Sequence, residues 1–190
     1  MREYDQIAAW YTAARDPEIG AAEVAAFART LAPGAHILDL GCGDGAPVSQ
    51  VLAAGGARPV GLDSSREMLA RYRARFPEAP TVLARAQDAE LDAGTFRGIV
   101  AWGVLFHMSA ADQEAVIARV GAWLAPGGRF LFTAAAEAGE RTGEMDGVAF
   151  RYVSLGADGY RRAVERAGMR LDDARHDAWD NYVCVATKPA

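Results

Sequence analysis

A glycine-rich loop between an apolar run and a helical pattern constrains this chain more than any other feature. Residues 36–40 (HILDL) form a short apolar run of the kind that becomes a buried parallel strand. Gly41, Gly43 and Gly45 follow, and this segment is too rich in glycine to continue as strand or helix. Apolar residues then recur at helical spacing from Val48. The stretch therefore predicts the first strand–loop–helix crevice of a doubly wound α/β sheet, where adenine-containing cofactors bind.

The rest of the chain alternates short apolar strands with amphipathic helices, which predicts a mostly parallel sheet covered on both faces. The expected strands span residues 36–40, 58–62, 81–84, 96–102, 129–133, 169–172 and 182–187. Two helices are expected within residues 1–30, and others after Ser64, which has capping-box spacing to Glu67, after Ser109 and around residues 160–167. Residues 134–153 show no clear period, so we expect a long loop or a small excursion there. Residues 1–190 thus form a single domain.

Composition narrows the partners and the compartment. The 190 residues are 51% hydrophobic and 24% charged, which is ordinary for a globular domain. The net charge is −5 and the arginines are scattered, so we expect no nucleic-acid partner. Cys42 and Cys184 suggest neither a metal site nor a disulfide framework, which favours a reducing cytoplasm. The sequence shows no signal-peptide core and no run near the ~20 apolar residues of a membrane span, so we expect a cytoplasmic protein with no membrane contact.

Four segments together resemble class I S-adenosylmethionine-dependent methyltransferases. They are DLGCGDG (39–45), VGLDSS (60–65), QDAEL (87–91) and WLAPGGRFLF (123–132). The segments occur in the family's order and spacing, and the likeness covers nearly the whole chain. It implies a single-domain, Rossmann-like, mostly parallel seven-stranded sheet whose last strand is antiparallel. It also implies S-adenosylmethionine as the cofactor and S-adenosylhomocysteine as its product.

The glycine loop has a main competing interpretation, the dinucleotide site of a nucleotide-dependent oxidoreductase. Such a site binds pyrophosphate with G-x-G-x-x-G, whereas the glycines here are Gly41, Gly43 and Gly45. Asp39 and Asp44 would repel a phosphate but suit the ammonium and sulfonium groups of S-adenosylmethionine. The loop therefore favours the methyl donor.

The resemblance also implies the residues that hold the cofactor. Asp63 ends the second strand and would accept hydrogen bonds from both ribose hydroxyls, with capping of the next helix as the alternative. Asp88 would accept from the adenine amino group and Ala89 would offer a backbone donor, unless Asp88 is an ordinary loop carboxylate. Asp39 has the alternative of holding the glycine loop, and Cys42 is better explained as a packing residue than as a nucleophile. The expected cofactor-binding residues are Tyr11, Asp39, Gly41, Cys42, Gly43, Asp63, Ser64, Asp88, Ala89 and Trp102.

Two segments bear on the methyl acceptor. The N-terminal helix carries Y-D-x-I-A-x-x-Y (Tyr4 to Tyr11), which resembles a helix that folds over the cofactor in related small-molecule enzymes; a docked structural helix is the alternative. His107 follows the fourth strand at the expected reaction centre, where it is a candidate general base or a structural residue. Trp102 packs on the cofactor or in the core. Residues 101–104 (AWGV) lack the D/N-P-P-Y/F of members that methylate nucleobase amino groups, which again disfavours nucleic acid.

The sequence therefore predicts a cytoplasmic enzyme that transfers a methyl group from S-adenosylmethionine to a small molecule, with the 134–153 segment near the acceptor. The alternative is a non-catalytic S-adenosylmethionine sensor or partner subunit. Such a protein would keep Gly41, Gly43 and Asp63 but would lack an enclosed acceptor pocket.

Overall fold

The computed structural model describes residues 2–190, and the side chains of residues 3–190. Its helices are α1 (Arg2–Ala14), α2 (Ala21–Ala28), α3 (Val48–Ala54), α4 (Arg66–Arg75), the short 3₁₀ helix η1 (Leu105–His107), α5 (Ala110–Trp123) and α6 (Gly156–Arg166). Its strands are β1 (His36–Leu40), β2 (Arg58–Asp63), β3 (Thr81–Leu83), β4 (Phe96–Ala101), β5 (Leu124–Ala134), β6 (Ala138–Met145), β7 (Val148–Leu155), β8 (Arg170–His176) and β9 (Tyr182–Thr187). None of the helices in this described part is long and apolar enough to cross a membrane.

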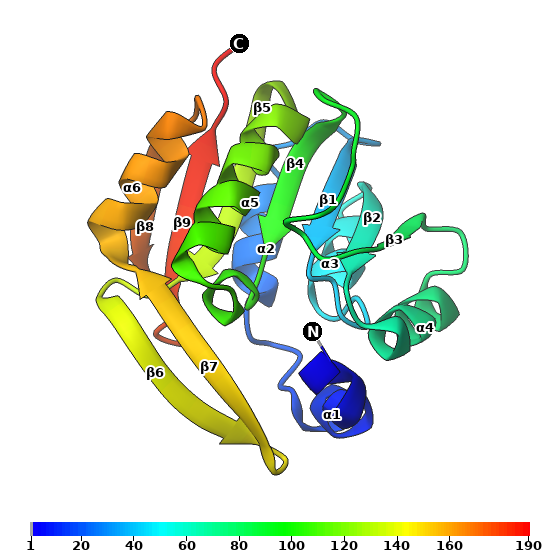
Figure 1. Ribbon diagram of the computed structural model, residues 1–190. Coiled ribbons are helices and arrows are strands. Elements are labelled where there is room, and N and C mark those ends of the chain that lie inside the picture. Colours follow the sequence, from blue (N-terminus) through cyan, green and yellow to red (C-terminus); the bar gives the residue numbers. More distant parts are fainter. Residues whose placement is uncertain (1) are drawn as a thin grey trace.

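The main sheet has seven strands in the order β3-β2-β1-β4-β5-β9-β8 (Figure 1). Strands β1 to β5 run parallel, and β9 is inserted antiparallel between β5 and β8. This confirms the predicted doubly wound sheet with an antiparallel last strand. In the parallel register Leu40 lies beside Leu62 and Asp63 beside Leu83, so the carboxyl ends of β1, β2 and β3 meet at one edge. Ligands of doubly wound sheets bind at this edge.

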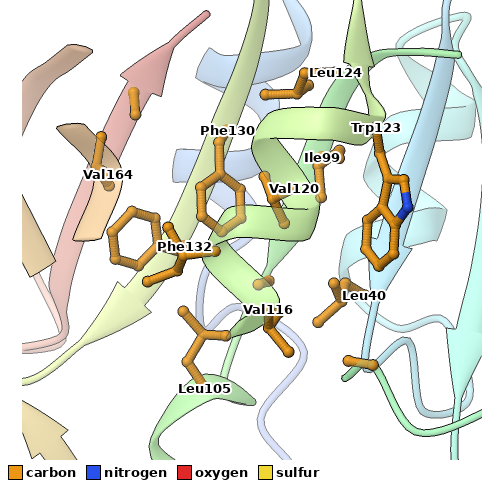
Figure 2. Packing of buried hydrophobic residues seen from close by; sticks show 14 of the residues in the cluster. Leu40, Ile99, Leu105, Val116, Val120, Trp123, Leu124, Phe130, Phe132 and Val164 are labelled. Atoms are coloured by element: carbon orange, nitrogen blue, oxygen red, sulfur yellow. The ribbon is translucent and has the colours of Figure 1, made fainter. Parts of the chain in front are cut away.

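Each face of the sheet has its own apolar layer, because successive strand residues point to opposite sides. One layer joins α5 and α6 to the sheet through Leu40, Ile99, Phe132 and other buried residues (Figure 2). The opposite layer joins α2 and α3 to Ile37 of β1 and to neighbouring strands. The strands are therefore covered on both sides, and only their ends and the loops that follow them are left to form a site.

The structure decides one open prediction and overturns another. Residues 134–153 belong to a small excursion rather than a long loop, because β6 and β7 pair as an antiparallel hairpin that stands apart from the main sheet (Figure 1). Strand β6 is exposed along most of its length, so no alternation of polar and apolar residues marks it. Helix α4 is capped by Ser65, whose Oγ accepts from the Met68 N–H at 3.1 Å, and not by a Ser64–Glu67 capping box.

Candidate active site

The candidate site is a pocket at the carboxyl edge of β1, β2 and β4, closed by α1. It encloses about 150 Å³. Residues from the glycine loop, from the segment after β3, from the β4–α5 connection and from α1 line it together. They include Tyr4, Tyr11, Arg15, Gly41, Gly43, Asp63, Ser64, Arg85, Ala86, Gln87, Trp102, Gly103, His107 and Asp112. Among the sequence-predicted residues, Tyr11, Gly41, Gly43, Asp63, Ser64, Trp102 and His107 thus lie together.

The glycine loop approaches the pocket with its main chain. Gly41 has a φ of 75°, and a Cβ there would lie 2.5 Å from Cγ2 of Val104, so the close packing of the two loops requires glycine. Gly43 has a φ of 54°, and a Cβ there would meet no atom within 4 Å. Gly43 and the similarly open Gly103 line the pocket, so their missing side chains leave room for a ligand to contact the backbone.

Four N–H groups of this loop are already used inside the fold. Those of Gly41 and Cys42 donate to the carbonyl oxygen of Leu62 at 2.7 and 3.0 Å, and that of Gly45 donates to the Cys42 carbonyl at 2.8 Å. The Gly43 N–H donates to the Asp63 carboxylate. A phosphate-binding loop offers free N–H groups to the anion. These donors are not available to a phosphate, so the geometry disfavours the dinucleotide interpretation.

Asp63 ends β2 and is fixed from two sides. Its Oδ2 accepts from the Gly43 N–H at 2.9 Å, and its Oδ1 accepts from the Ser65 N–H at 2.8 Å. Burial raises the pKa of Asp63, and these two hydrogen bonds partly offset that effect. Each carboxylate oxygen keeps a second lone pair. Asp63 therefore supports the glycine loop and still has acceptor positions for a ligand hydroxyl.

Asp39 lies beneath the loop and does not line the pocket. It is 1% exposed, and its Oδ2 accepts from Ser49 Oγ at 2.7 Å; Ser49 Oγ is in turn 2.9 Å from the hydroxyl of Tyr72. Burial raises the pKa of Asp39 to about 7. Cys42 is also buried away from the pocket, and burial with the nearby Asp39 raises the pKa of its thiol, so it is an inert packing residue.

The charge argument for the loop is weaker than the sequence predicts. Asp44 forms an ion pair with Arg75 at 2.7 Å, and burial disfavours the charged form of Asp39. Neither carboxylate is therefore a free negative charge at the pocket. The internal use of the loop N–H groups now carries the distinction from a dinucleotide site.

The segment after β3 presents different residues from those expected. Asp88 is exposed and lies 3.8 Å from Arg85 in an ion pair, and Ala89 is buried in the core beneath α5. The Asp88 N–H donates to the Arg85 carbonyl at 2.9 Å, so the chain turns there and directs Asp88 to solvent. Ala86 and Gln87 line the pocket in their place. Gln87 directly precedes Asp88 in the same motif, so the observed pocket residue and the expected one differ by a single position in the turn.

Trp102 forms part of the pocket wall behind Gly103. It is 7% exposed, and Gly20 before α2 lies so close to its indole that a Cβ at Gly20 would come within 2.4 Å of Cε2. The Gly103 N–H donates to Thr133 Oγ1 at 2.8 Å, which ties this loop to β5. Trp102 is therefore both a core residue and a pocket residue, as the two interpretations of its sequence position allowed.

Helix α1 closes the pocket and is held by polar contacts at several points. Arg15 Nη1 donates to the Ala46 carbonyl beside the glycine loop at 2.8 Å. Asp5 Oδ1 accepts from Ser65 Oγ at the start of α4. Tyr4 Oη lies 3.0 Å from His107 Nε2. Sequence reasoning expected a helix at this place, but it missed Asp5 and Arg15 because their partners lie far away in the sequence.

His107 lies in η1 within a group of aromatic rings. Its ring centroid is 4.9 Å from that of Phe106, 5.1 Å from Tyr152, 5.5 Å from Tyr4 and 5.6 Å from Phe150. Burial lowers the pKa of His107 to about 4, so the ring is neutral at physiological pH. The two residues of β7 in this group come from the hairpin that the sequence left without a structure.

Comparison with known proteins adds a matched domain and a fold. Residues 37–128 match the family described as methyltransferase domain. An uncharacterized methyltransferase of Synechocystis sp. is 36% identical over 100 residues, covering 53% of this chain and 47% of the relative. Trans-aconitate 2-methyltransferase of Delftia acidovorans is also 36% identical over 100 residues, covering 52% of this chain and 37% of that protein. The match thus spans less than half the length of either relative.

Solved structures share the whole fold at low identity. The CcbJ methyltransferase from Streptomyces caelestis has a TM-score of 0.81 at 20% identity, covering 99% of this chain and 98% of its own. An amino pentose methyltransferase from Micromonospora echinaspora, solved with S-adenosylmethionine bound, has a TM-score of 0.76 at 20% identity, covering 95% of both chains. Residues 37–128 thus match a methyltransferase domain, and the whole chain shares the fold of these two methyltransferases.

Proposed function

We propose that this protein transfers the methyl group of S-adenosylmethionine to a small-molecule acceptor. The observation that carries the proposal is the arrangement of Asp63 and Gly43 at the carboxyl edge of the sheet. The carboxylate is fixed by two backbone N–H groups, lines the pocket and keeps free lone pairs, as a ribose-binding acid requires.

The residues present fit this cofactor. Gly43 and Gly103 leave open space at the pocket wall, where a side chain would fill the room that a ligand needs. Four N–H groups of the glycine loop are used internally, which suits a cationic ligand better than a phosphate. Arg15 lines the same pocket and donates one N–H to Ala46, which leaves guanidinium donors for a carboxylate. The Asp63 carboxylate and the Arg15 guanidinium thus match a ligand with hydroxyl and carboxylate groups.

We assign the cofactor's parts to residues of this chain as follows. Asp63 would hold the ribose hydroxyls, and Ala86 with Gln87 would contact the adenine in place of the expected Asp88 and Ala89. Arg15 and Tyr11 would hold the amino-acid end. When bound, S-adenosylmethionine supplies an electrophilic methyl group. The protein then has to align the acceptor and exclude water, which the closure of the pocket by α1 favours.

A small acceptor is favoured by the shape of the site and by the similar proteins. The pocket is enclosed by α1 on one side and by the β4–α5 connection on the other, with His107 and Asp112 in its wall. Trans-aconitate 2-methyltransferase and the amino pentose methyltransferase are both named for small-molecule acceptors. We therefore place the acceptor at the end of the pocket formed by Tyr4, His107 and Asp112.

The test is calorimetric binding of S-adenosylhomocysteine to the wild type and to Asp63→Ala. Loss of hydrogen bonds from a buried charged acceptor costs roughly 1.5–3 kcal/mol each, so the affinity should fall by about ten- to a thousandfold. Asp88→Ala is the matched control, since this exposed carboxylate lies outside the pocket, and its affinity should be unchanged. Equal affinity of a folded Asp63→Ala protein would contradict the assignment. A screen of small-molecule acceptors for S-adenosylhomocysteine release then tests turnover.

A further inference from the structure

Both nitrogens of His107 are covered. Nε2 lies 3.0 Å from Tyr4 Oη, and Nδ1 is buried with no hydrogen-bond partner among the described residues. The rings of Phe106, Phe150 and Tyr152 surround the imidazole. An acceptor in the pocket therefore cannot reach either nitrogen while Tyr4 stays in place, although the His107 ring forms part of the pocket wall.

Tyr4 occupies the position between that imidazole and the pocket. It lines the pocket, and its ring contacts Tyr11 at 5.2 Å and Phe150 at 5.3 Å between centroids. A phenol has one hydrogen to donate and two lone pairs. If Tyr4 donates to Nε2, both lone pairs remain, and if it accepts from Nε2–H, one lone pair and its hydrogen remain. In either tautomer of His107, the hydroxyl keeps a hydrogen-bonding position for the acceptor.

Both partners stay uncharged over the physiological range. Burial lowers the pKa of His107 to about 4, and burial together with Tyr11 and Tyr152 raises the pKa of Tyr4. A neutral imidazole orients a hydroxyl by hydrogen bonding without competing for the proton. Neighbouring contacts hold the backbone of Tyr4, since the adjacent Asp5 accepts from Ser65 Oγ at the start of α4.

We propose that the Tyr4 hydroxyl is the polar group that contacts the methyl acceptor, and that His107 is a positioning residue that acts through Tyr4. The inference rests on the proposed function. It assigns to α1 a residue that touches the substrate, and it predicts an acceptor whose reacting group hydrogen-bonds a neutral hydroxyl. Alignment of such a group with the methyl carbon is the contribution that a positioned hydrogen bond makes to methyl transfer.

The test is a double-mutant cycle of Tyr4→Phe and His107→Phe, both of which keep an aromatic ring. Rates are measured on the acceptor that the S-adenosylhomocysteine-release screen identifies. Each single variant should lower kcat by about 10- to 100-fold with S-adenosylhomocysteine affinity within about twofold, and the double variant should lose no more than the worse single one. Tyr182→Phe is the matched control, because Tyr182 packs on His176 at 5.4 Å outside the pocket, and its kcat should be unchanged.

Additive losses in the double variant, or full activity of Tyr4→Phe beside an impaired His107→Phe, would overturn the inference, because His107 would then act on the acceptor without Tyr4. Failure of the wild type to bind S-adenosylhomocysteine would instead remove the proposed function and the inference together. A second measurement needs no acceptor. The chain has three histidines, so ¹⁵N spectra resolve the His107 imidazole. Tyr4→Phe should shift its tautomer equilibrium between pH 5.5 and 8, and identical spectra of the two proteins would contradict the contact.

Discussion

Asp39 makes the stability of this protein depend on pH in a direction that a single substitution can isolate. The carboxyl group is 1% exposed beneath the glycine loop, and burial raises its pKa from 3.8 to about 7. The folded protein therefore holds this proton more tightly than the unfolded chain does. The stabilisation is fully present below the unfolded pKa and is lost as the pH rises through the folded pKa. Asp39→Asn removes the titration while its side-chain oxygen can still accept from Ser49.

The size of the effect follows from the two pKa values. A tenfold difference in proton affinity is worth about 1.4 kcal/mol, so the unfolding free energy should change by ~4 kcal/mol in total as the pH rises from below the unfolded pKa to above the folded one. About 3 kcal/mol of it falls between pH 5 and pH 8. Urea unfolding of the wild type and of Asp39→Asn at pH 5, 6.5 and 8 measures it, with Trp fluorescence as the probe. Relative to the wild type, Asp39→Asn should gain about 3 kcal/mol of unfolding free energy as the pH rises from 5 to 8.

Asp88→Asn supplies the control for the loss of a carboxylate, since Asp88 is exposed. Other titrating groups cancel in the comparison because all three proteins share them. Parallel curves for Asp39→Asn and the wild type would refute the reasoning, and so would a difference that grows toward acid. Parallel curves would mean that Asp39 has an ordinary pKa in the folded state, and a difference that grows toward acid would mean that Ser49 and its surroundings hold that pKa below its ordinary value.

Three further perturbations test the packing around the site. Gln113→Leu removes three hydrogen bonds, two donated to main-chain carbonyls after η1 and in β7 at 3.0 and 2.8 Å and one accepted from the Tyr160 hydroxyl at 2.6 Å. It should lower the unfolding free energy by about 3 kcal/mol in urea titration. Gly20→Ala should lower the unfolding free energy by about 2 kcal/mol and weaken S-adenosylhomocysteine binding by displacing Trp102. Gly34 also has a left-handed φ but no neighbour within 4 Å, so Gly34→Ala should lower the unfolding free energy less and leave binding unchanged. Burial depresses the pKa of His107, so the stability that the neutral imidazole contributes is lost as the pH falls. The unfolding free energy of His107→Phe should therefore fall by ~3 kcal/mol less than that of the wild type between pH 7 and pH 4. Equal acid dependence of both proteins would contradict this.

Local patterns were enough to predict the strands that carry the glycine loop and Asp63. β1 has the predicted bounds, and Ser109 caps α5 as expected, with its Oγ accepting from the Asp112 N–H. The glycine loop and Asp63 lie within a few residues of strands whose apolar runs are unmistakable. Parallel strands align their carboxyl ends, so residues that follow each strand meet without further information. Proximity at that edge is therefore a consequence of periodicity alone.

The sequence was least informative where the outcome depends on a turn register or on exposure. Gln87 lines the pocket, whereas its neighbour Asp88, whose N–H donates to the Arg85 carbonyl within the turn, does not. The hairpin of β6 and β7 escaped detection because β6 is exposed on both faces, which leaves no alternation to find. The predicted charge of Asp44 was cancelled by Arg75, a partner 31 residues away. A sequence states which groups are present but does not state which of them neutralise one another.

The part of the pocket that we propose for the acceptor shows why its chemistry is harder to predict than that of the part proposed for the cofactor. Tyr4 and His107 are 103 residues apart, and the rings of Phe150 and Tyr152 come from a hairpin outside the main sheet. No repeat or spacing links these segments, so their contact depends on how α1 and the hairpin dock on a finished sheet. Such peripheral elements can change without disturbing the strands that hold the glycine loop and Asp63. The same sheet can therefore keep one methyl donor while exchanging the residues that select the acceptor, and Tyr4 on α1 is the residue at which that exchange should act on the rate.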